Sequence, residues 1–173
     1  MRVGRTGRFG RLNAAAVIRR SVQWVERRYV AVIGPSEASS DEVEQAERLG
    51  RLLAEAGAVV VCGGLGGVME AASRGASSVG GMVVGLLPGS DRAAANPYVT
   101  VAVATGMGEM RNALVVRAAD SVLAVGGAYG TLSEIALAVR TGVPVVGLGT
   151  WALDDVVDAP DVEAAVALAL ELA

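Results

Sequence analysis

Short runs rich in Val and Ile alternate with longer segments of helical spacing, and this alternation constrains the fold more than any other feature of the chain. Runs such as Ala58–Val61 and Val83–Leu87 are hydrophobic almost throughout. Such runs are typical of parallel strands that are buried on both faces. The alternation therefore predicts an α/β fold, a doubly wound parallel sheet of about six or seven strands with helices on both faces.

The expected elements can be placed along the chain. Ser39 stands three residues before Glu42, which is the spacing of a helix capping box. A chain of 173 residues fits one domain. We predict a basic extension over 1–28, which is either disordered or forms a helix from 13 to 28, and a single domain over 29–173. The predicted strands lie near 29–33, 58–62, 82–87, 98–103, 121–125 and 144–148, and the predicted helices near 40–56, 66–78, 107–119, 131–141 and 160–172.

The first 28 residues hold eight Arg and one acid, whereas the rest holds seven Arg and 17 acids. Such an arm suits nucleic acid, a membrane surface or targeting, but a solvated extension is the simpler interpretation, and we expect no nucleic-acid partner. It lacks the apolar stretch of a secretory signal, and no run of about 18 apolar residues predicts a membrane span.

Whole chemistries are absent because all 15 basic residues are Arg and the chain has neither Lys nor His. Without Lys there is no Schiff base to pyridoxal phosphate and no Walker-A loop. Without His there is no Ser-His-Asp system and no imidazole zinc site, and we expect no metal. The lone cysteine, Cys62, lies in an apolar run and is predicted to be a core residue. A single thiol suits a reducing cytoplasm, which is the expected location.

Two glycine-rich turns follow the first two predicted strands, at the sheet edge where ligands of such folds bind. The Ser36 hydroxyl can meet a phosphate or cap the next segment. In the second turn, 62–70, Met69 stands where a dinucleotide fingerprint needs Gly or Ala. This turn offers bare backbone to an anion at a helix N-terminus, and it equally suits close packing of strand and helix. The candidate ligand-binding residues here are Gly34, Ser36, Gly63, Gly64, Gly66, Gly67 and Met69.

Two later turns add charge and a hydroxyl. Arg111 can reach over the strand ends toward a phosphate or form an ordinary surface salt bridge. Three glycines and Thr131 between the fifth strand and its helix form a nest of N–H groups for a phosphate. Thr131 and Glu134 also have capping-box spacing, in which case they only satisfy each other's backbone N–H groups. The candidate binding residues of these turns are Asn112, Gly127, Gly130 and Thr131.

The four turns together resemble the LOG ("lonely guy") and molybdenum-cofactor-carrier-like superfamily, a Rossmann-like group often mislabelled as lysine decarboxylases. The resemblance covers about residues 29–150. The LOG hallmark P-G-G-x-G-T-x-x-E is matched by 126–134, which keeps the Gly-Thr pair and the final Glu but has Gly126 in place of Pro. The upstream M-H-x-R-K element keeps its arginine as Arg111, with Glu109 in place of His and Asn112 in place of Lys.

These departures, together with the turns 63–70 and 80–85, resemble the carrier-like branch of the superfamily. That branch implies binding of a phosphorylated nucleotide- or pterin-type molecule, such as a nucleoside monophosphate or the molybdenum cofactor, with no other cofactor required. The LOG branch implies the alternative, a phosphoribohydrolase that cleaves the N-glycosidic bond of nucleoside 5′-monophosphates. In that case the catalytic residues are Glu134 and Arg111, and Glu70 or Glu109 is a candidate second carboxylate. The resemblance also implies a homo-oligomer, a dimer or tetramer, and the absence of Lys rules out a pyridoxal-phosphate lysine decarboxylase.

Overall fold

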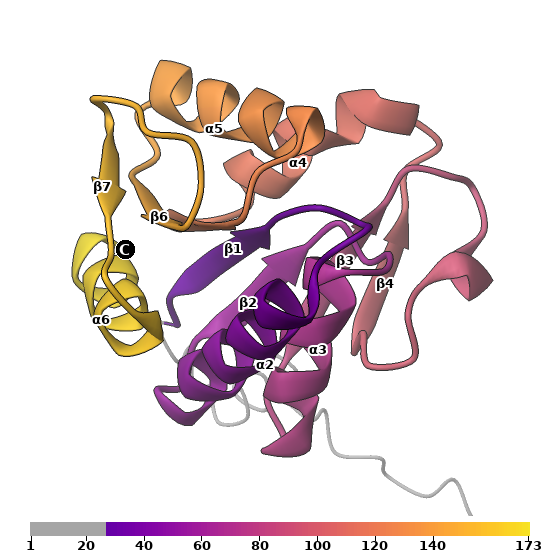
Figure 1. Ribbon diagram of the computed structural model, residues 1–173. Helices are drawn as coiled ribbons and strands as arrows, with labels where there is room; N and C mark the ends of the chain where they lie inside the picture. The colour runs from indigo at the N-terminus through magenta and orange to yellow at the C-terminus, as the bar shows by residue number, and fades with distance from the viewer. Residues whose placement is uncertain (1–26) are drawn as a thin grey trace, which may run out of the picture.

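Seven parallel strands form one sheet at the centre of the computed structural model, which describes residues 27–173. Figure 1 shows the sheet between two layers of helices. The predicted Rossmann-like α/β fold is therefore confirmed. The strand order is β4-β3-β2-β1-β5-β6-β7. The strands are β1 (Tyr29–Ile33), β2 (Val59–Cys62), β3 (Val83–Leu87), β4 (Val101–Ala104), β5 (Ser121–Val125), β6 (Val145–Leu148) and β7 (Val156–Asp158).

Helices cover both faces of the sheet, as a doubly wound fold requires. In Figure 1, α4 and α5 lie above the sheet, and α2, α3 and α6 lie below it. The side chains alternate accordingly along the central strand. Val30 and Val32 of β1 pack in the layer of α2, α3 and α6, whereas Ala31 and Ile33 pack in the layer of α4 and α5. The helices are α2 (Ser40–Glu55), α3 (Val68–Ser78), α4 (Asn112–Arg117), α5 (Tyr129–Thr141) and α6 (Val162–Leu172).

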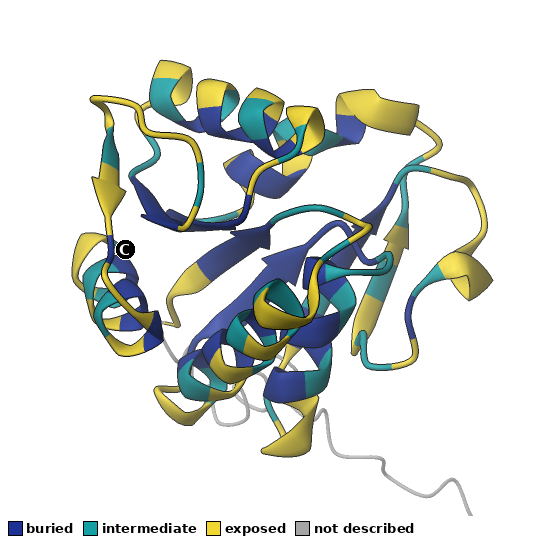
Figure 2. Ribbon diagram, in the orientation of Figure 1, coloured by how far each residue is buried: buried dark blue, intermediate teal, exposed yellow. Residues whose placement is uncertain are grey.

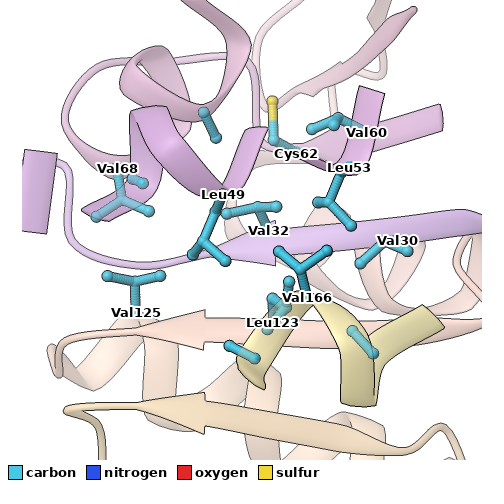
Figure 3. Packing of buried hydrophobic residues seen from close by; sticks show 14 of the residues in the cluster. Val30, Val32, Leu49, Leu53, Val60, Cys62, Val68, Leu123, Val125 and Val166 are labelled. Carbon is cyan, nitrogen blue, oxygen red and sulfur yellow. The ribbon is translucent and has the colours of Figure 1, made fainter. Parts of the chain in front are cut away.

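The larger core layer is built from Val and Leu side chains. Figure 3 shows Leu49 and Leu53 of α2 and Val166 of α6 packed over β1 and β5. The burial colours of Figure 2 show the central strands as the most deeply buried part of the described chain. Burial on this scale, at about 25 cal/mol per Å² of apolar surface, is the main force that holds the sheet and helices together.

Helix α2 begins as its sequence predicts. The Ser39 hydroxyl accepts from the Glu42 N–H at 3.3 Å, and the Glu42 carboxylate accepts from the Ser39 N–H at 2.7 Å. This reciprocal capping box satisfies two N–H groups that the helix itself leaves free. Helix α6 is capped in a related way, because Asp161 accepts from the Ala164 N–H at 2.8 Å.

The predicted boundaries differ from the structure at several places, and α3 and α6 each begin two residues later than expected. Strand β7 was not predicted, because its three residues are mostly exposed and form no long apolar run. The helix expected over 107–119 is a 3₁₀ helix (Gly108–Arg111) followed by the short α4. Helix α5 begins two residues earlier than expected, and strand β4 begins at Val101 instead of near 98.

The topology creates a crevice next to the central strand. Strand β1 pairs with β2 on one side and with β5 on the other. The chain leaves the carboxyl ends of β1 and β5 into helices on opposite faces of the sheet. Ligands of open α/β sheets bind at such a switch point.

The extension 1–28 lies outside the described residues except for its last two, so its predicted helix and its separation from the domain remain predictions. Within residues 27–173, no helix is long and apolar enough to cross a membrane.

Candidate ligand-binding site

A cavity of about 310 Å³ lies at the switch point, at the carboxyl ends of the strands. Residues that follow five successive strands, β1 to β5, line it. Eight of the residues that the sequence singled out meet there: Gly34, Ser36, Met69, Arg111, Asn112, Gly130, Thr131 and Glu134. We call this cavity the switch-point pocket. Some larger hollows lie elsewhere on the described residues. Those of about 620 and 490 Å³ lie near Arg27 and Gly57 at the amino ends of the strands, and no predicted site residue lines them. Another, of about 560 Å³, shares Asn112 and Gly130 with the switch-point pocket.

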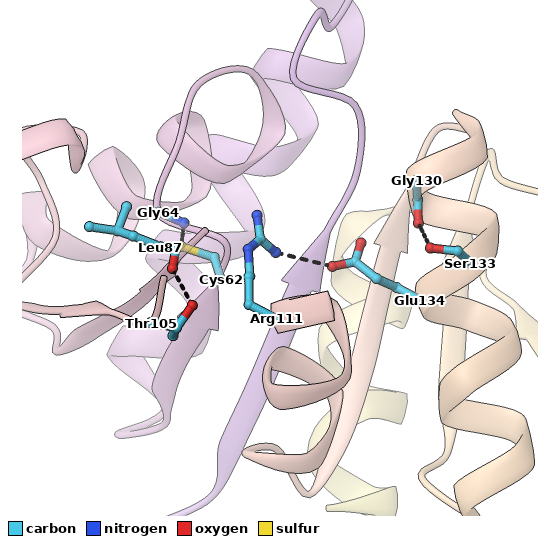
Figure 4. Close-up of polar contacts among 8 residues, drawn as sticks. All are labelled: Cys62, Gly64, Leu87, Thr105, Arg111, Gly130, Ser133 and Glu134. Carbon is cyan, nitrogen blue, oxygen red and sulfur yellow. Dashed lines mark hydrogen bonds and ion pairs between the residues drawn. The ribbon is translucent and has the colours of Figure 1, made fainter. Parts of the chain in front are cut away.

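Arg111 and Glu134 form a buried ion pair in the switch-point pocket. Arg111 ends the 3₁₀ helix before α4, and Glu134 lies on α5. Each residue is only 7% exposed, and the distance from Arg111 Nη1 to Glu134 Oε1 is 3.5 Å (Figure 4). Charge-assisted hydrogen bonds of this type are usually about 2.7–2.9 Å long. The pair is therefore loose, and Arg111 is not the surface salt bridge that the sequence left open.

Burial disfavours the charged forms of both partners. It raises the pKa of Glu134 to about 7, although the Arg111 charge acts in the opposite direction. Burial also lowers the pKa of Arg111, and the Glu134 charge offsets part of this change. The attraction between the two charges thus offsets only part of the free energy that both groups lose by leaving water. Near neutral pH, Glu134 can hold or release a proton.

Thr131 lies inside α5 and not at its start, so the capping-box hypothesis for Thr131 and Glu134 is wrong. The residue before the helix is Ala128, and no side chain caps this terminus. The Thr131 hydroxyl is buried and has no hydrogen-bond partner among residues 27–173, and neither has Nε of Arg111. Buried polar groups are normally paired. Both of these donors belong to residues that line the switch-point pocket, whereas a third unpaired hydroxyl, that of Thr150, does not.

The N-terminus of α5 therefore stays open toward the pocket, in contrast to α2 and α6, which side chains cap. Ala128, Gly130 and Thr131 at this terminus all line the pocket. Free N–H groups at a helix N-terminus and the helix dipole both favour an anion.

Gly63 and Gly67, in the turn after β2, serve packing in this structure. A side chain at Gly63 would overlap the Arg111 guanidinium and the Met69 sulfur. Gly67 has a φ of 63°, and a side chain there would overlap backbone atoms of Pro35 and Ser36. Gly63 therefore leaves room for the buried arginine. Five predicted binding residues, Gly63, Gly64, Gly66, Gly67 and Gly127, do not line the pocket.

One of the two candidate second carboxylates is at the pocket. Glu109 lines it from the 3₁₀ helix, whereas Glu70 does not. Cys62 is fully buried at the end of β2, where burial raises the pKa of its thiol. It lies 3.6 Å from the Ser73 hydroxyl and accepts from the Gly64 N–H at 3.4 Å, in accord with its predicted core role. Among residues 27–173, no group of three or more His, Cys, Asp or Glu could hold a metal ion.

Six residues that line the pocket are not among the predicted binding or catalytic residues. Pro88 follows β3, and the shared edge of a parallel sheet could have drawn attention to it. The other apolar and glycine residues carry no polar side chain that would mark them in the sequence as candidates for ligand binding. The six are Pro35, Leu65, Pro88, Gly108, Glu109 and Ala128, of which Glu109 was considered only as a second carboxylate.

Known proteins match this chain over most of its length. The SLOG cluster4 family matches residues 27–171. An uncharacterized protein of Archaeoglobus fulgidus is 44% identical over 119 residues, which are 69% of this chain and 78% of that protein. The molybdenum cofactor binding protein of Rippkaea orientalis has a similar structure, with a TM-score of 0.81, 33% identity, and coverage of 85% of this chain and 98% of that one.

The molybdenum cofactor carrier protein of Chlamydomonas reinhardtii is similar as well. Its TM-score is 0.78 at 31% identity, over 84% of this chain and 98% of that chain. The resemblance to the carrier-like branch that the four turns indicated is thus confirmed. The family match spans nearly all described residues, including the whole switch-point pocket. The chain belongs to the SLOG cluster4 family.

Proposed function

We propose that this protein binds a phosphorylated small molecule of the nucleotide or pterin type in the switch-point pocket and does not break its bonds. The observation that carries the proposal is the pair of buried, unpartnered donors, Thr131 Oγ1 and Arg111 Nε. An unpaired buried polar group costs about 1–3 kcal/mol. A phosphate whose oxygens accept from both donors would remove this cost.

The groups around the pocket have distinct roles in this proposal. The Arg111 guanidinium supplies the positive charge and the Thr131 hydroxyl donates to a phosphate oxygen. The open N-terminus of α5 adds backbone N–H groups and its dipole. Asn112 and Ser36, which also line the pocket, offer neutral donors and acceptors to the rest of the molecule.

The structural relatives support a pterin ligand in particular. Two of them are named for binding or carrying the molybdenum cofactor, which is a phosphorylated pterin. The cofactor would then be the cargo of this protein. A carrier needs donors for the phosphate and a pocket that opens to solvent, and it needs no nucleophile.

A phosphoribohydrolase is the second candidate, and one observation favours it. Glu134 and Glu109 both line the pocket, and burial places the pKa of Glu134 near 7. A carboxyl group that gains and loses a proton near neutral pH can orient or deprotonate a water molecule. In this candidate Glu134 acts on water or on the ribose, and Arg111 holds the phosphate.

One experiment separates the two functions. The protein and its Glu134→Gln variant are incubated with AMP, GMP, IMP and CMP, binding is measured by calorimetry, and free base is measured by chromatography. Binding without release supports the carrier function. Release of free base by the wild type but not by the variant would establish the hydrolase. If neither the four nucleotides nor isolated molybdopterin bind, the proposal is overturned.

We also propose that the protein is a homo-oligomer, associated through the outer surface of α4 and α5. Met110 is 75% exposed and Tyr129 84% exposed, and together with Leu137 they line the hollow of about 560 Å³. Exposed apolar groups gathered in this way often mark a protein interface. By contrast, Val162, Ala165, Val166 and Ala169 of α6 are buried within the subunit. Light scattering on a sizing column measures the mass, and a monomer across micromolar concentrations would refute the proposal.

The cytoplasmic location stays a prediction.

A further inference from the structure

We infer that the switch-point pocket takes up a doubly charged oxyanion together with one proton, and that Glu134 holds this proton in the complex. This inference rests on the proposed function, because it describes how the pocket accepts the phosphate. It goes further in naming the charge of the ligand group and the residue that sets it.

The charged groups that line the pocket do not favour a dianion as they stand. Within the described part of the chain they are Arg111, Glu109 and Glu134, one positive and two negative side chains. Moreover, the single positive charge is already matched by Glu134 within the buried pair. A dianion would therefore add two negative charges to a site with no surplus positive charge, where solvent screens poorly. The dipole of α5 contributes only about half a positive charge.

A proton on Glu134 removes this conflict. The neutral carboxyl group releases Arg111 to pair with the anion and gains an O–H that donates to it. The unpartnered Thr131 hydroxyl supplies another donor in the same pocket. The anion then meets one full positive charge, two hydroxyl-type donors and the open end of α5.

Among the described residues around Glu134, no other proton acceptor is equally buried. From the turn before α4, Arg111 faces it and opposes the rise of its pKa. At the end of β2, the Cys62 thiol has a pKa that burial raises and that the Glu134 charge raises further. The carboxyl ends of β1 and β5 carry only apolar residues there, Val32, Ile33, Ala124 and Val125. Glu109 lines the pocket but is exposed to solvent. Glu134 is thus the buried group that a nearby negative charge affects most.

The protonation equilibrium of Glu134 is already balanced near neutral pH. Burial raises its pKa to about 7 in the absence of a ligand. A neighbouring dianion raises the pKa of a carboxyl group further, because like charges disfavour ionisation. At pH 8 most Glu134 side chains are ionised before binding and protonated after it, so binding takes up about one proton.

Calorimetry with inorganic sulfate tests this inference, since sulfate remains a dianion throughout the pH range used. Wild-type protein is titrated at pH 8 in two buffers of different ionisation enthalpy, and the difference in heat gives the protons taken up. We expect about 0.9 proton per sulfate, and a Kd that rises about 30-fold from its low-pH limit to pH 8.5.

Two variants assign the proton. Glu134→Gln mimics the protonated form, so it should take up no proton, keep a Kd constant with pH and bind sulfate more tightly than the wild type at pH 8.5. The matched control is Glu109→Gln, which removes the exposed carboxylate of the same pocket and should keep the proton uptake of the wild type. If circular dichroism shows that Glu134→Gln does not fold, the test is made with the other two proteins. Proton uptake by the wild type that persists in Glu109→Gln then supports the inference.

The possible failures are distinguishable. Sulfate binding with less than about 0.2 proton taken up, uptake that persists in Glu134→Gln, or uptake lost in Glu109→Gln would overturn the inference. Absence of sulfate binding while a nucleotide or molybdopterin binds would also overturn it, and the proposed function would stand. Absence of binding by sulfate and by every phosphorylated ligand would overturn both.

Discussion

Replacing Glu134 by Gln should make the free energy of unfolding less dependent on pH. Glu134 has a pKa of about 7 in the folded protein, because it is buried, against 4.5 for an unperturbed glutamate. Each tenfold change in proton affinity is worth about 1.4 kcal/mol, so the difference corresponds to about 3 kcal/mol. A Gln side chain has nearly the same shape as the protonated Glu and does not titrate.

The direction follows from where the proton binds. Between pH 4.5 and 7 the folded protein holds a proton on Glu134 that the unfolded chain has largely released. Stability from this group is therefore fully present below pH 4.5 and is lost as the pH rises through 7. Relative to the wild type, the Glu134→Gln variant should gain about 3 kcal/mol between pH 4 and pH 8.

Urea unfolding of both proteins, followed by circular dichroism at half-unit steps from pH 4 to 8, measures this difference. Other titrating groups contribute to both curves and cancel when one is subtracted from the other. Equal protein concentrations keep any association comparable. A difference that stays constant within about 0.5 kcal/mol, or that falls with pH as it does for a carboxylate with a lowered pKa, would refute the argument from burial.

Three further substitutions test other parts of the site and fold. Thr131→Val removes an unpaired buried hydroxyl, so urea unfolding should show unchanged or higher stability. Sulfate affinity measured by calorimetry should fall about tenfold or more. A loss of stability above about 1 kcal/mol would mean that the hydroxyl has a partner in the folded protein. Gly63→Ala should displace the Arg111 guanidinium, with a loss of about 1–3 kcal/mol and of sulfate binding. In the same turn, Gly66→Ala meets its neighbours at 3.8 Å and beyond and serves as the control, and equal effects of the two would contradict the packing argument. Ser39→Ala should cost about 1 kcal/mol of unfolding free energy, because it breaks the capping box of α2, and an unchanged urea midpoint would count against that role.

Much of the fold was predictable because burial leaves a clear pattern in sequence. The runs at 58–62 and 121–125 are apolar on both faces, which only central parallel strands require. Strand β7 gave no such pattern, since it is a short edge strand whose residues are mostly exposed. The helix expected over 107–119 begins instead with a 3₁₀ turn, where Gly106 and Gly108 have positive φ angles that a regular helix excludes.

The site was predictable to the level of the strand ends but not of individual roles. Thr131 and Glu134 have the same spacing in a capping box and in a helix that begins two residues earlier, and only the observed start at Tyr129 separates the two. Likewise, a glycine that contacts a ligand and one that makes room for a side chain are identical in sequence. A side chain at Gly63 would overlap Arg111, which lies 48 positions further along the chain, and no local sequence pattern contains such a contact.

The position of β1 between β2 and β5 has a consequence for how the protein folds. Its partner on one side begins at Val59, but its partner on the other begins at Ser121, and the Tyr29 N–H donates to Asp120 across 91 positions of the chain. Loops of that length close slowly, because chain entropy is lost before the contacts form. The switch-point pocket needs both sides, since Ser36 and Met69 come from the early part of the chain and Arg111 and Glu134 from the late part. Partly folded chains in which only β1 to β4 have assembled thus lack the ion pair and the open end of α5. An anion that binds the pocket therefore stabilises only those molecules in which the later half of the sheet has also formed.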